Sequence, residues 1–218
     1  MLLNREETDA IDARVASVEA ATGVEIVAAV IGKSDAYTEL PWKAFALGAS
    51  LAALVTVWAD EWWPDWITMH AALKFAVAVL ACGGASALAA VFIPGYARSF
   101  LRASRRDVEV RQYAQALFLE RELFRARGRT GLLLLVSSFE RKVEVLPDTG
   151  FRGRVNASDW HDVVARMTPR LREGRAADAL LEGLGGLQDV LVRNGFRGGA
   201  NPVNELPDRP IDEPGPRS

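Results

Sequence analysis

The sequence has few of the side chains on which metal binding and nucleophilic catalysis depend. Cys82 is the single cysteine among 218 residues, so no intramolecular disulfide can form and no oxidising compartment is implied. The two histidines, His70 and His161, have no partner at metal-ligand spacing, and neither a Gly-x-Ser-x-Gly elbow nor a Gly-x-x-x-x-Gly-Lys phosphate loop occurs. We therefore predict no metal, no cofactor and no catalytic residue.

The chain has little excess of one sign of charge and few features of a targeting signal. The net charge of −2 gives no overall reason to expect nucleic acid as a partner. The first residues contain neither the basic region nor the apolar stretch of a signal peptide, and acidic residues begin at Glu6. We therefore expect the N-terminus to stay in the cytoplasm.

Long uncharged runs are present, and there are two of them, 44–59 and 75–93. As helices they would be about 24 and 28 Å long, close to the ~30 Å hydrocarbon core of a bilayer. The first comes nearer to full length if it starts at Pro41 and Lys43 reaches back to the interface. These runs predict a transmembrane hairpin over 41–97, and the alternative is a buried helical hairpin in a soluble protein.

The tryptophans favour the membrane interpretation, because indoles prefer the headgroup region. Five of the six lie near the ends of the two runs or between them: Trp42, Trp58, Trp62, Trp63 and Trp66. The basic residues Lys43, Arg98, Arg102, Arg105 and Arg106 flank the hairpin, whereas the loop 60–70 has acids and no Lys or Arg. The positive-inside bias therefore predicts a multi-pass protein of the cell (inner) membrane with cytoplasmic N- and C-termini, in contact with membrane lipids.

Outside the hairpin the sequence reads as an ordinary α/β protein. We predict helices over 4–21, over 107–125, from a cap at Ser158 onward and over 175–194, and strands over 24–31, 132–137 and 142–146. Asn4 and Glu7 form a capping box for the first helix, and Pro169 leaves the end of the third helix open. The glycines Gly183, Gly185 and Gly186 lie inside a helical pattern, which indicates close helix packing.

A strand, a crossover helix and a second strand predict a right-handed unit in a mostly parallel sheet, with the membrane hairpin inserted in the crossover. We divide the chain into a first part of the α/β domain (1–40), the hairpin (41–97), a second part of the domain (98–196) and a Pro-rich tail (197–218). The tail has no apolar period, so we predict that it is disordered.

Polar residues gather in the sequence on either side of the predicted strand pair 132–146. A hairpin there would bring Arg129 and Asp148 together at its open end, with further arginines nearby. The set comprises Arg125, Arg127, Arg129, Asp148, Arg152 and Arg154. One interpretation is an ion pair on a solvated rim, and the other is a site for an anion or a partner protein.

Several segments resemble the TPM domain family. They are Tyr113-Ala114, Arg129-Thr130-Gly131 with the strand that follows, Glu140-Arg141-Lys142-Val143, Gly150-Phe151 and 167–174. The resemblance extends over 1–40 and 107–192 and skips the hairpin. It implies a three-layer α/β/α sandwich with a small sheet. It also implies one of several activities, since members include weak acid phosphatases, calcium binders and assembly or repair factors.

Two departures from the family pattern affect the expected function. Arg129-Thr130-Gly131 stands where the family usually has Asp-Asn-Gly, and Thr149-Gly150-Phe151 where it commonly has Gly-Tyr-Gly. The place where the family would hold a cation is therefore basic here. We expect a membrane-anchored, non-catalytic interaction or assembly module with an unknown protein partner. The alternatives are a weak, possibly metal-assisted phosphatase and a small-anion-binding sensor.

Overall fold

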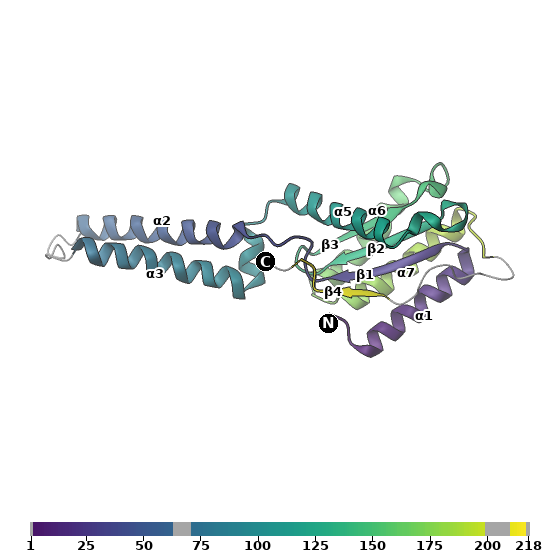
Figure 1. The fold of residues 1–218 in the computed structure, drawn as a ribbon, viewed down its shortest axis with the longest axis horizontal. Helices are drawn as coiled ribbons and strands as arrows, with labels where there is room; N and C mark the ends of the chain where they lie inside the picture. The colour runs from purple at the N-terminus through teal and green to yellow at the C-terminus, as the bar shows by residue number, and fades with distance from the viewer. Residues whose placement is uncertain (1, 63–70, 199–209, 217–218) are drawn as a thin grey trace. The chain divides into compact units, whose positions relative to one another are not determined.

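The computed structural model describes residues 2–62, 71–198 and 210–216, and the chain forms two compact units (Figure 1). The α/β unit comprises Met1–Ala36 and Arg106–Arg217, and the helical unit comprises Tyr37–Arg105. The predicted loop tryptophans Trp63 and Trp66 lie outside the described residues.

The α/β unit is built on a mixed four-stranded sheet of order β3-β2-β1-β4. The strands are β1 (Glu25–Ile31), β2 (Gly131–Ser137), β3 (Lys142–Pro147) and β4 (Ile211–Glu213). Strand β1 pairs in parallel with both β2 and β4, and β2 pairs antiparallel with β3. The prediction of a mostly parallel sheet is confirmed, and so are the three strands expected from the sequence.

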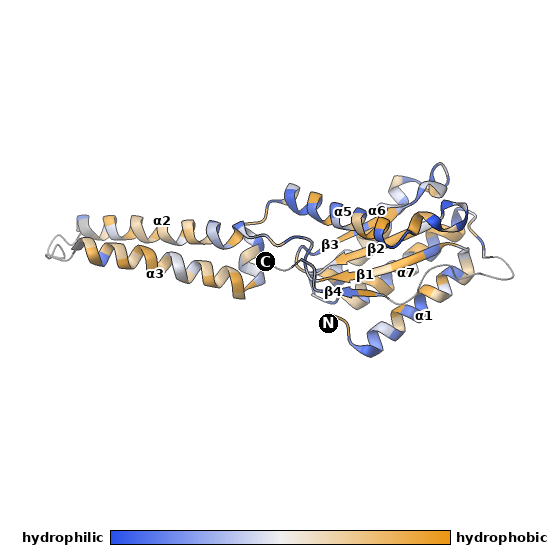
Figure 2. Ribbon diagram, in the orientation of Figure 1, coloured by the Kyte–Doolittle hydropathy of each residue, from blue (hydrophilic) through white to orange (hydrophobic). Residues whose placement is uncertain are grey.

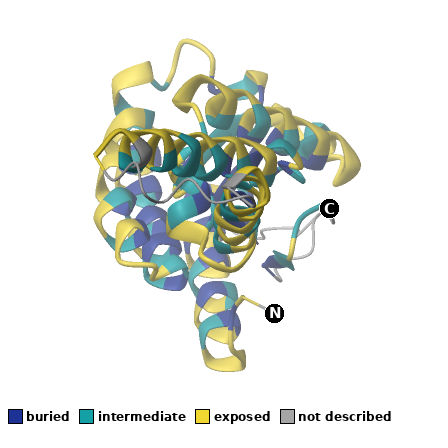
Figure 3. Ribbon diagram, turned by 90° about the vertical axis from the view of Figure 1, so that its left-hand side faces the viewer, coloured by how far each residue is buried: buried dark blue, intermediate teal, exposed yellow. Residues whose placement is uncertain are grey.

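Helices cover both faces of this sheet, which gives the predicted three layers. They are α1 (Arg5–Thr22), α6 (Ala157–Arg172) and α7 (Ala176–Arg193) on one face and α5 (Ala103–Glu120) on the other. Successive residues of β1 alternate between the two cores, so Ile26 packs with the first group of helices and Val27 with α5. Buried residues concentrate in this unit (Figure 3).

Local capping explains where the first helix begins and ends. The Asn4 side chain accepts from the backbone N–H of Glu7 at 2.8 Å, and the Glu7 carboxylate accepts from the N–H of Asn4 at 2.7 Å. Gly23 ends the helix in the left-handed region at φ 70°, where glycine has no steric penalty. The predicted capping box is confirmed.

The helix predicted over 107–125 differs in both bounds. It begins at Ala103 and ends at Glu120, and two 3₁₀ turns follow, η2 (Leu123–Arg125) and η3 (Arg127–Arg129). The change of direction is driven by Leu123, which is fully buried in the core under α5. Burial of one leucine contributes about 1.5–3 kcal/mol, enough to outweigh one more helical turn at the surface.

The helix α6 corrects the predicted cap. Its N-cap is Asn156, which forms a capping box with Asp159, so Ser158 lies inside the first turn. The helix also continues through Pro169 to Arg172. Met167 packs where Gly183 of α7 lacks a side chain, and this close packing between α6 and α7 offsets the hydrogen bond that proline cannot donate. The prediction of close packing at Gly183 agrees with these contacts.

The fourth strand lies inside the tail for which the sequence predicts disorder, and for residues 211–213 that prediction is wrong. Asp212 accepts from the backbone N–H of Leu2 at 2.9 Å and of Leu3 at 3.2 Å. Glu213 accepts from the Tyr113 hydroxyl at 2.9 Å. These contacts hold the strand beside β1, and residues 199–209 are outside the described residues.

A buried polar cluster lies at the end of the sheet opposite to the predicted arginine rim. The Glu140 carboxylate accepts from the backbone N–H of Ser34 at 2.9 Å and from its hydroxyl at 2.7 Å. The Ser137 hydroxyl donates to the other carboxylate oxygen. Glu140 is only 1% exposed, so this network ties the end of β1 to the β2–β3 turn.

The helical unit contains α2 (Glu39–Trp62), α3 (Ala71–Phe92) and the short α4 (Pro94–Ser99). Two stretches, Glu39–Ala59 and Ala72–Phe92, are each 21 residues long and apolar enough to cross a membrane (Figure 2). Gly48 lies against Cys82 and Ser86 of α3, and Gly83 lies against Phe45 of α2. These two glycines therefore let α2 and α3 approach each other closely.

Large apolar side chains of this unit point outward. Trp42, Trp58 and Trp62 are 74%, 59% and 65% exposed, in contrast to the tryptophan of the α/β unit, Trp160, which is partly buried. An apolar surface of this extent on a pair of helices is unusual for a protein surrounded by water.

Candidate functional site

The predicted arginine rim lies around the open end of the β2–β3 hairpin. Leu132 pairs with Pro147 at the last position of the ladder, and the N–H of Asp148 donates to the carbonyl of Gly131 at 3.0 Å. The turn η3 precedes β2, and η4 (Thr149–Phe151) follows β3. The hairpin therefore brings together two loops that lie about twenty residues apart in the chain.

Arg129 and Asp148 meet at this end in a two-pronged ion pair. Arg129 Nη2 lies 3.0 Å from Asp148 Oδ1, and Arg129 Nε lies 2.9 Å from Oδ2. The Asp148 side chain is 4% exposed, and the backbone N–H of Thr149 donates to it at 2.7 Å. Oδ1 accepts both hydrogen bonds, Oδ2 lies within ion-pair distance of the guanidinium, and the ion-pair interpretation of these two residues agrees with the structure.

The two loops approach so closely that one position requires glycine. A Cβ on Gly150 would lie 2.6 Å from the carbonyl oxygen of Arg129, which belongs to the backbone and cannot move aside cheaply. Arg129 itself has φ 59°, an unusual conformation for a side chain of its size. The close packing of backbone at Gly150 therefore holds Arg129 in position above Asp148.

The remaining predicted rim residues have different surroundings. Arg125 pairs with Glu122 at 2.6 Å, and Arg127 is exposed on η3. Arg154 stacks on the ring of Phe196, with its guanidinium carbon 3.6 Å from the ring centroid. Arg152 lines a hollow that the sequence did not predict. The structure therefore joins Arg129 to Asp148 and gives the other arginines separate neighbours.

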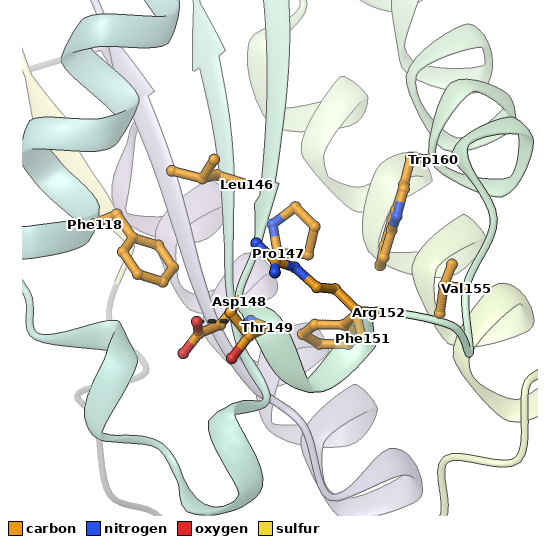
Figure 4. A pocket seen from close by; sticks show the side chains of 9 residues that line it. All are labelled: Phe118, Leu146, Pro147, Asp148, Thr149, Phe151, Arg152, Val155 and Trp160. Atoms are coloured by element: carbon orange, nitrogen blue, oxygen red, sulfur yellow. Dashed lines mark hydrogen bonds between the residues drawn. The ribbon is translucent and has the colours of Figure 1, made fainter.

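This hollow of about 320 Å³ lies beside the end of β3 (Figure 4). Phe118 of α5 stands on one side and Trp160 of α6 on the other, with Pro147 between them. The other lining residues are Leu146, Asp148, Thr149, Phe151, Arg152 and Val155. The walls come from three separate parts of the chain, so no local sequence pattern predicted the hollow. One wall residue, Phe151, does lie in a segment, Gly150-Phe151, that resembles the TPM family.

Charged groups occupy the free edge of β3 before this hollow. Lys142 Nζ lies 2.9 Å from Asp107 Oδ1 and 3.8 Å from Glu144 Oε2. The hydrogen bond from Lys142 holds the pKa of Asp107 below its usual range, whereas burial raises the pKa of Glu144 against the opposing effect of Lys142. Charges along an edge strand discourage the addition of another strand.

The residues at the hairpin end do not fit the cation that the family resemblance implies. Hard cations such as Ca²⁺ take six to eight oxygen ligands in proteins. Asp148 already has Arg129 at both oxygens. Within the described parts of the chain, no group of three or more His, Cys, Asp and Glu side chains could hold a metal ion.

Comparison with known proteins agrees with the resemblance seen in the sequence. Residues 98–190 match the TPM domain family. The match covers a little less than half of the chain. The matched region contains β2, β3, the hollow and most of α7, so the arginine rim lies within it.

A solved structure shows the same fold. The chain is similar to the BA42 protein of the psychrophilic bacterium Bizionia argentinensis, with a TM-score of 0.58 and 14% identity over 96% of this chain and 94% of that one. Identity at this level supports the fold alone. A search among curated proteins gives no match.

Proposed function

We propose that this chain is a membrane-anchored TPM-domain protein whose α/β unit acts as a non-catalytic interaction or assembly module. The observation that carries the proposal is the ion pair at the hairpin end. Arg129 contacts both oxygens of Asp148, so the arginine takes the place that a cation would need. A site of this kind is suited to holding structure or a partner rather than to activating a phosphate ester.

The proposed anchor is the α2/α3 hairpin. Two stretches of 21 residues are long enough to span a bilayer, and large apolar side chains cover their surface. Basic residues flank the hairpin at Lys43 and over 98–106, which favours both termini in the cytoplasm and membrane lipids as neighbours.

Cysteine labelling tests this topology. In a Cys82→Ala background, a cysteine at Asp65 should react with an impermeant thiol reagent from outside intact cells, and a cysteine at Asp35 should not. Asp65 lies outside the described residues, and its placement here rests on the charge bias alone. The opposite labelling pattern would contradict the orientation.

The non-catalytic role is tested with the full chain in mild detergent. Aryl-phosphate hydrolysis should be the same for the wild type and for Asp148→Asn, with or without added Ca²⁺, because Asp148 takes no part in chemistry. Turnover that disappears in Asp148→Asn would support the weak phosphatase instead.

Partner binding is tested by chemical cross-linking in native membranes. The full chain should give a discrete adduct that a chain reduced to the helical unit does not give. An adduct formed equally well by the helical unit alone would show that the α/β unit is not the interaction module.

A further inference from the structure

The hollow beside β3 has rigid aromatic walls. The Phe151 ring packs edge-on against Trp160 at 5.5 Å between centroids and lies 5.2 Å from Phe196. Phe151 is buried, whereas Trp160 and Phe118 are only partly buried and keep a surface toward the hollow. Side chains held in this way lose little freedom when a ligand arrives, which favours binding.

A positive charge projects into these apolar surroundings. The Arg152 side chain extends toward Pro147, and both residues line the hollow (Figure 4). Among the described residues, Arg152 has no carboxylate partner, and Arg154 has a ring partner and no carboxylate. Arg125 and Arg129 are neutralised by Glu122 and Asp148. The uncompensated charge at this end of the sheet is therefore positive and lies on the hollow.

Size restricts the occupant to a small part of a partner. The volume of about 320 Å³ is near the lower limit of small-molecule pockets, which range over about 300–1,000 Å³. It has room for one or two side chains. Addition of a whole strand along β3 is disfavoured because Lys142 and Glu144 place charges on that edge.

We propose that this hollow docks a short acidic and apolar segment of a partner protein. An aliphatic side chain of that segment lies between Phe118 and Trp160, and a neighbouring carboxylate pairs with Arg152. The argument is charge complementarity: the hollow offers apolar walls and an unpaired guanidinium, so its occupant must bring apolar surface and negative charge together. This inference rests on the proposed function, since it names the partner chemistry of the same unit.

Peptide binding to the full chain in detergent tests this proposal. The probe is the fluorescein-labelled peptide Ser-Leu-Asp-Leu-Ser, followed by fluorescence anisotropy. The peptide Ser-Leu-Asn-Leu-Ser removes the charge, and Ser-Ser-Asp-Ser-Ser removes the apolar side chains. Each change should weaken binding by at least about tenfold, which corresponds to the loss of one charge-assisted contact or of one buried leucine.

Protein variants locate the site. Arg152→Glu should abolish binding of the acidic peptide and restore binding of the matching peptide with lysine in place of aspartate. The matched control is Arg172→Glu, which changes an exposed arginine of α6 away from the hollow and should leave affinity within about twofold. The Arg152 side chain is exposed, so its replacement is expected to leave the fold intact.

Several results would overturn the proposal. They are equal binding of the aspartate and asparagine peptides, equal losses in Arg152→Glu and Arg172→Glu, no binding of any peptide up to millimolar concentration, and complete displacement by inorganic phosphate. The last result would indicate a small-anion site. If no peptide binds but the cross-linked adduct persists in Arg152→Glu, the docking site is wrong and the interaction module stands. If the adduct is absent or hydrolysis depends on Asp148, the proposed function is wrong whatever the peptides do.

Discussion

Glu140→Ala tests how much the buried polar cluster contributes to the α/β unit. The carboxylate accepts hydrogen bonds from the backbone N–H and the hydroxyl of Ser34 and from the hydroxyl of Ser137, and Glu140 is 1% exposed. Each such bond contributes about 1–1.5 kcal/mol to stability, and alanine leaves buried donors with no acceptor. We expect Glu140→Ala to lower the free energy of unfolding by about 3–4.5 kcal/mol.

Two further substitutions separate the loss of the carboxylate charge and the loss of one hydroxyl donor from the loss of the whole set of hydrogen bonds. In Glu140→Gln the amide oxygen can still accept both bonds from Ser34, and the Ser137 hydroxyl can turn to accept from the amide nitrogen. Only the charge assistance is lost, so the expected cost is about 1–2 kcal/mol. Ser34→Ala removes a single hydroxyl donor and should cost about 1 kcal/mol.

The assay must report on the α/β unit alone, because the helical unit contributes to any global signal. Hydrogen exchange of β1 and β2, measured by mass spectrometry across a urea series in mild detergent, gives the opening free energy of these strands. An alanine variant no less stable than the glutamine variant, or a loss below about 1 kcal/mol in alanine, would refute the view that the cluster ties β1 to the β2–β3 turn.

Three other perturbations have defined outcomes. Gly150→Ala should lower the free energy of unfolding, measured by urea denaturation, by more than about 2 kcal/mol because the added Cβ would meet the Arg129 carbonyl. Gly153→Ala, at φ 73° in open space, should lower it by only about 1 kcal/mol. Equal losses in the two variants would contradict the close packing of the two loops. Burial and the hydrogen bond to Glu213 raise the pKa of Tyr113 to about 12 from 10.0, so this group stabilises the fold below pH 10 and the benefit is lost as pH rises to about 12. Tyr113→Phe should flatten the dependence of the free energy of unfolding on pH between 10 and about 12. An unchanged slope would argue against this role of Tyr113. Replacing residues 37–105 by Gly/Ser linkers of several lengths should give a domain with one thermal transition by circular dichroism, and aggregation at every length would show that the helical unit is needed for folding.

The strands could be predicted from sequence because each has a strong local signal. Residues 24–31 and 132–137 are largely continuous apolar runs, which predict strands buried on both faces. Residues 142–146 alternate between polar and apolar, which predicts a strand buried on one face. The strand β4 has a single apolar residue, Ile211, in a proline-rich segment. Its position is decided by Asp212 and Glu213 contacting residues more than ninety positions away, which no local window contains.

The exact ends of helices and the hollow also depend on residues outside the local sequence pattern, for different reasons. Asn156 and Ser158 are both good caps, and only the partner Asp159 decides between them in favour of Asn156. At the candidate site, the Arg129–Asp148 pair follows from a hairpin that could be predicted. The hollow does not, because Phe118 and Trp160 belong to separate helices, α5 and α6, which cover opposite faces of the sheet and line the same hollow only in the folded chain.

The order of the strands along the chain has a consequence for synthesis on the ribosome. One of the two inner strands, β1, is translated first, but about 100 residues separate its end at Ile31 from its partner β2 at Gly131. At about 5–20 residues per second this strand waits roughly 5–20 s for β2, and its other neighbour β4 comes last of all. During that interval an apolar seven-residue strand with two open edges is available to other chains. The nascent protein is therefore most prone to aggregate while the helical unit is being made, well before its own sheet can close around β1.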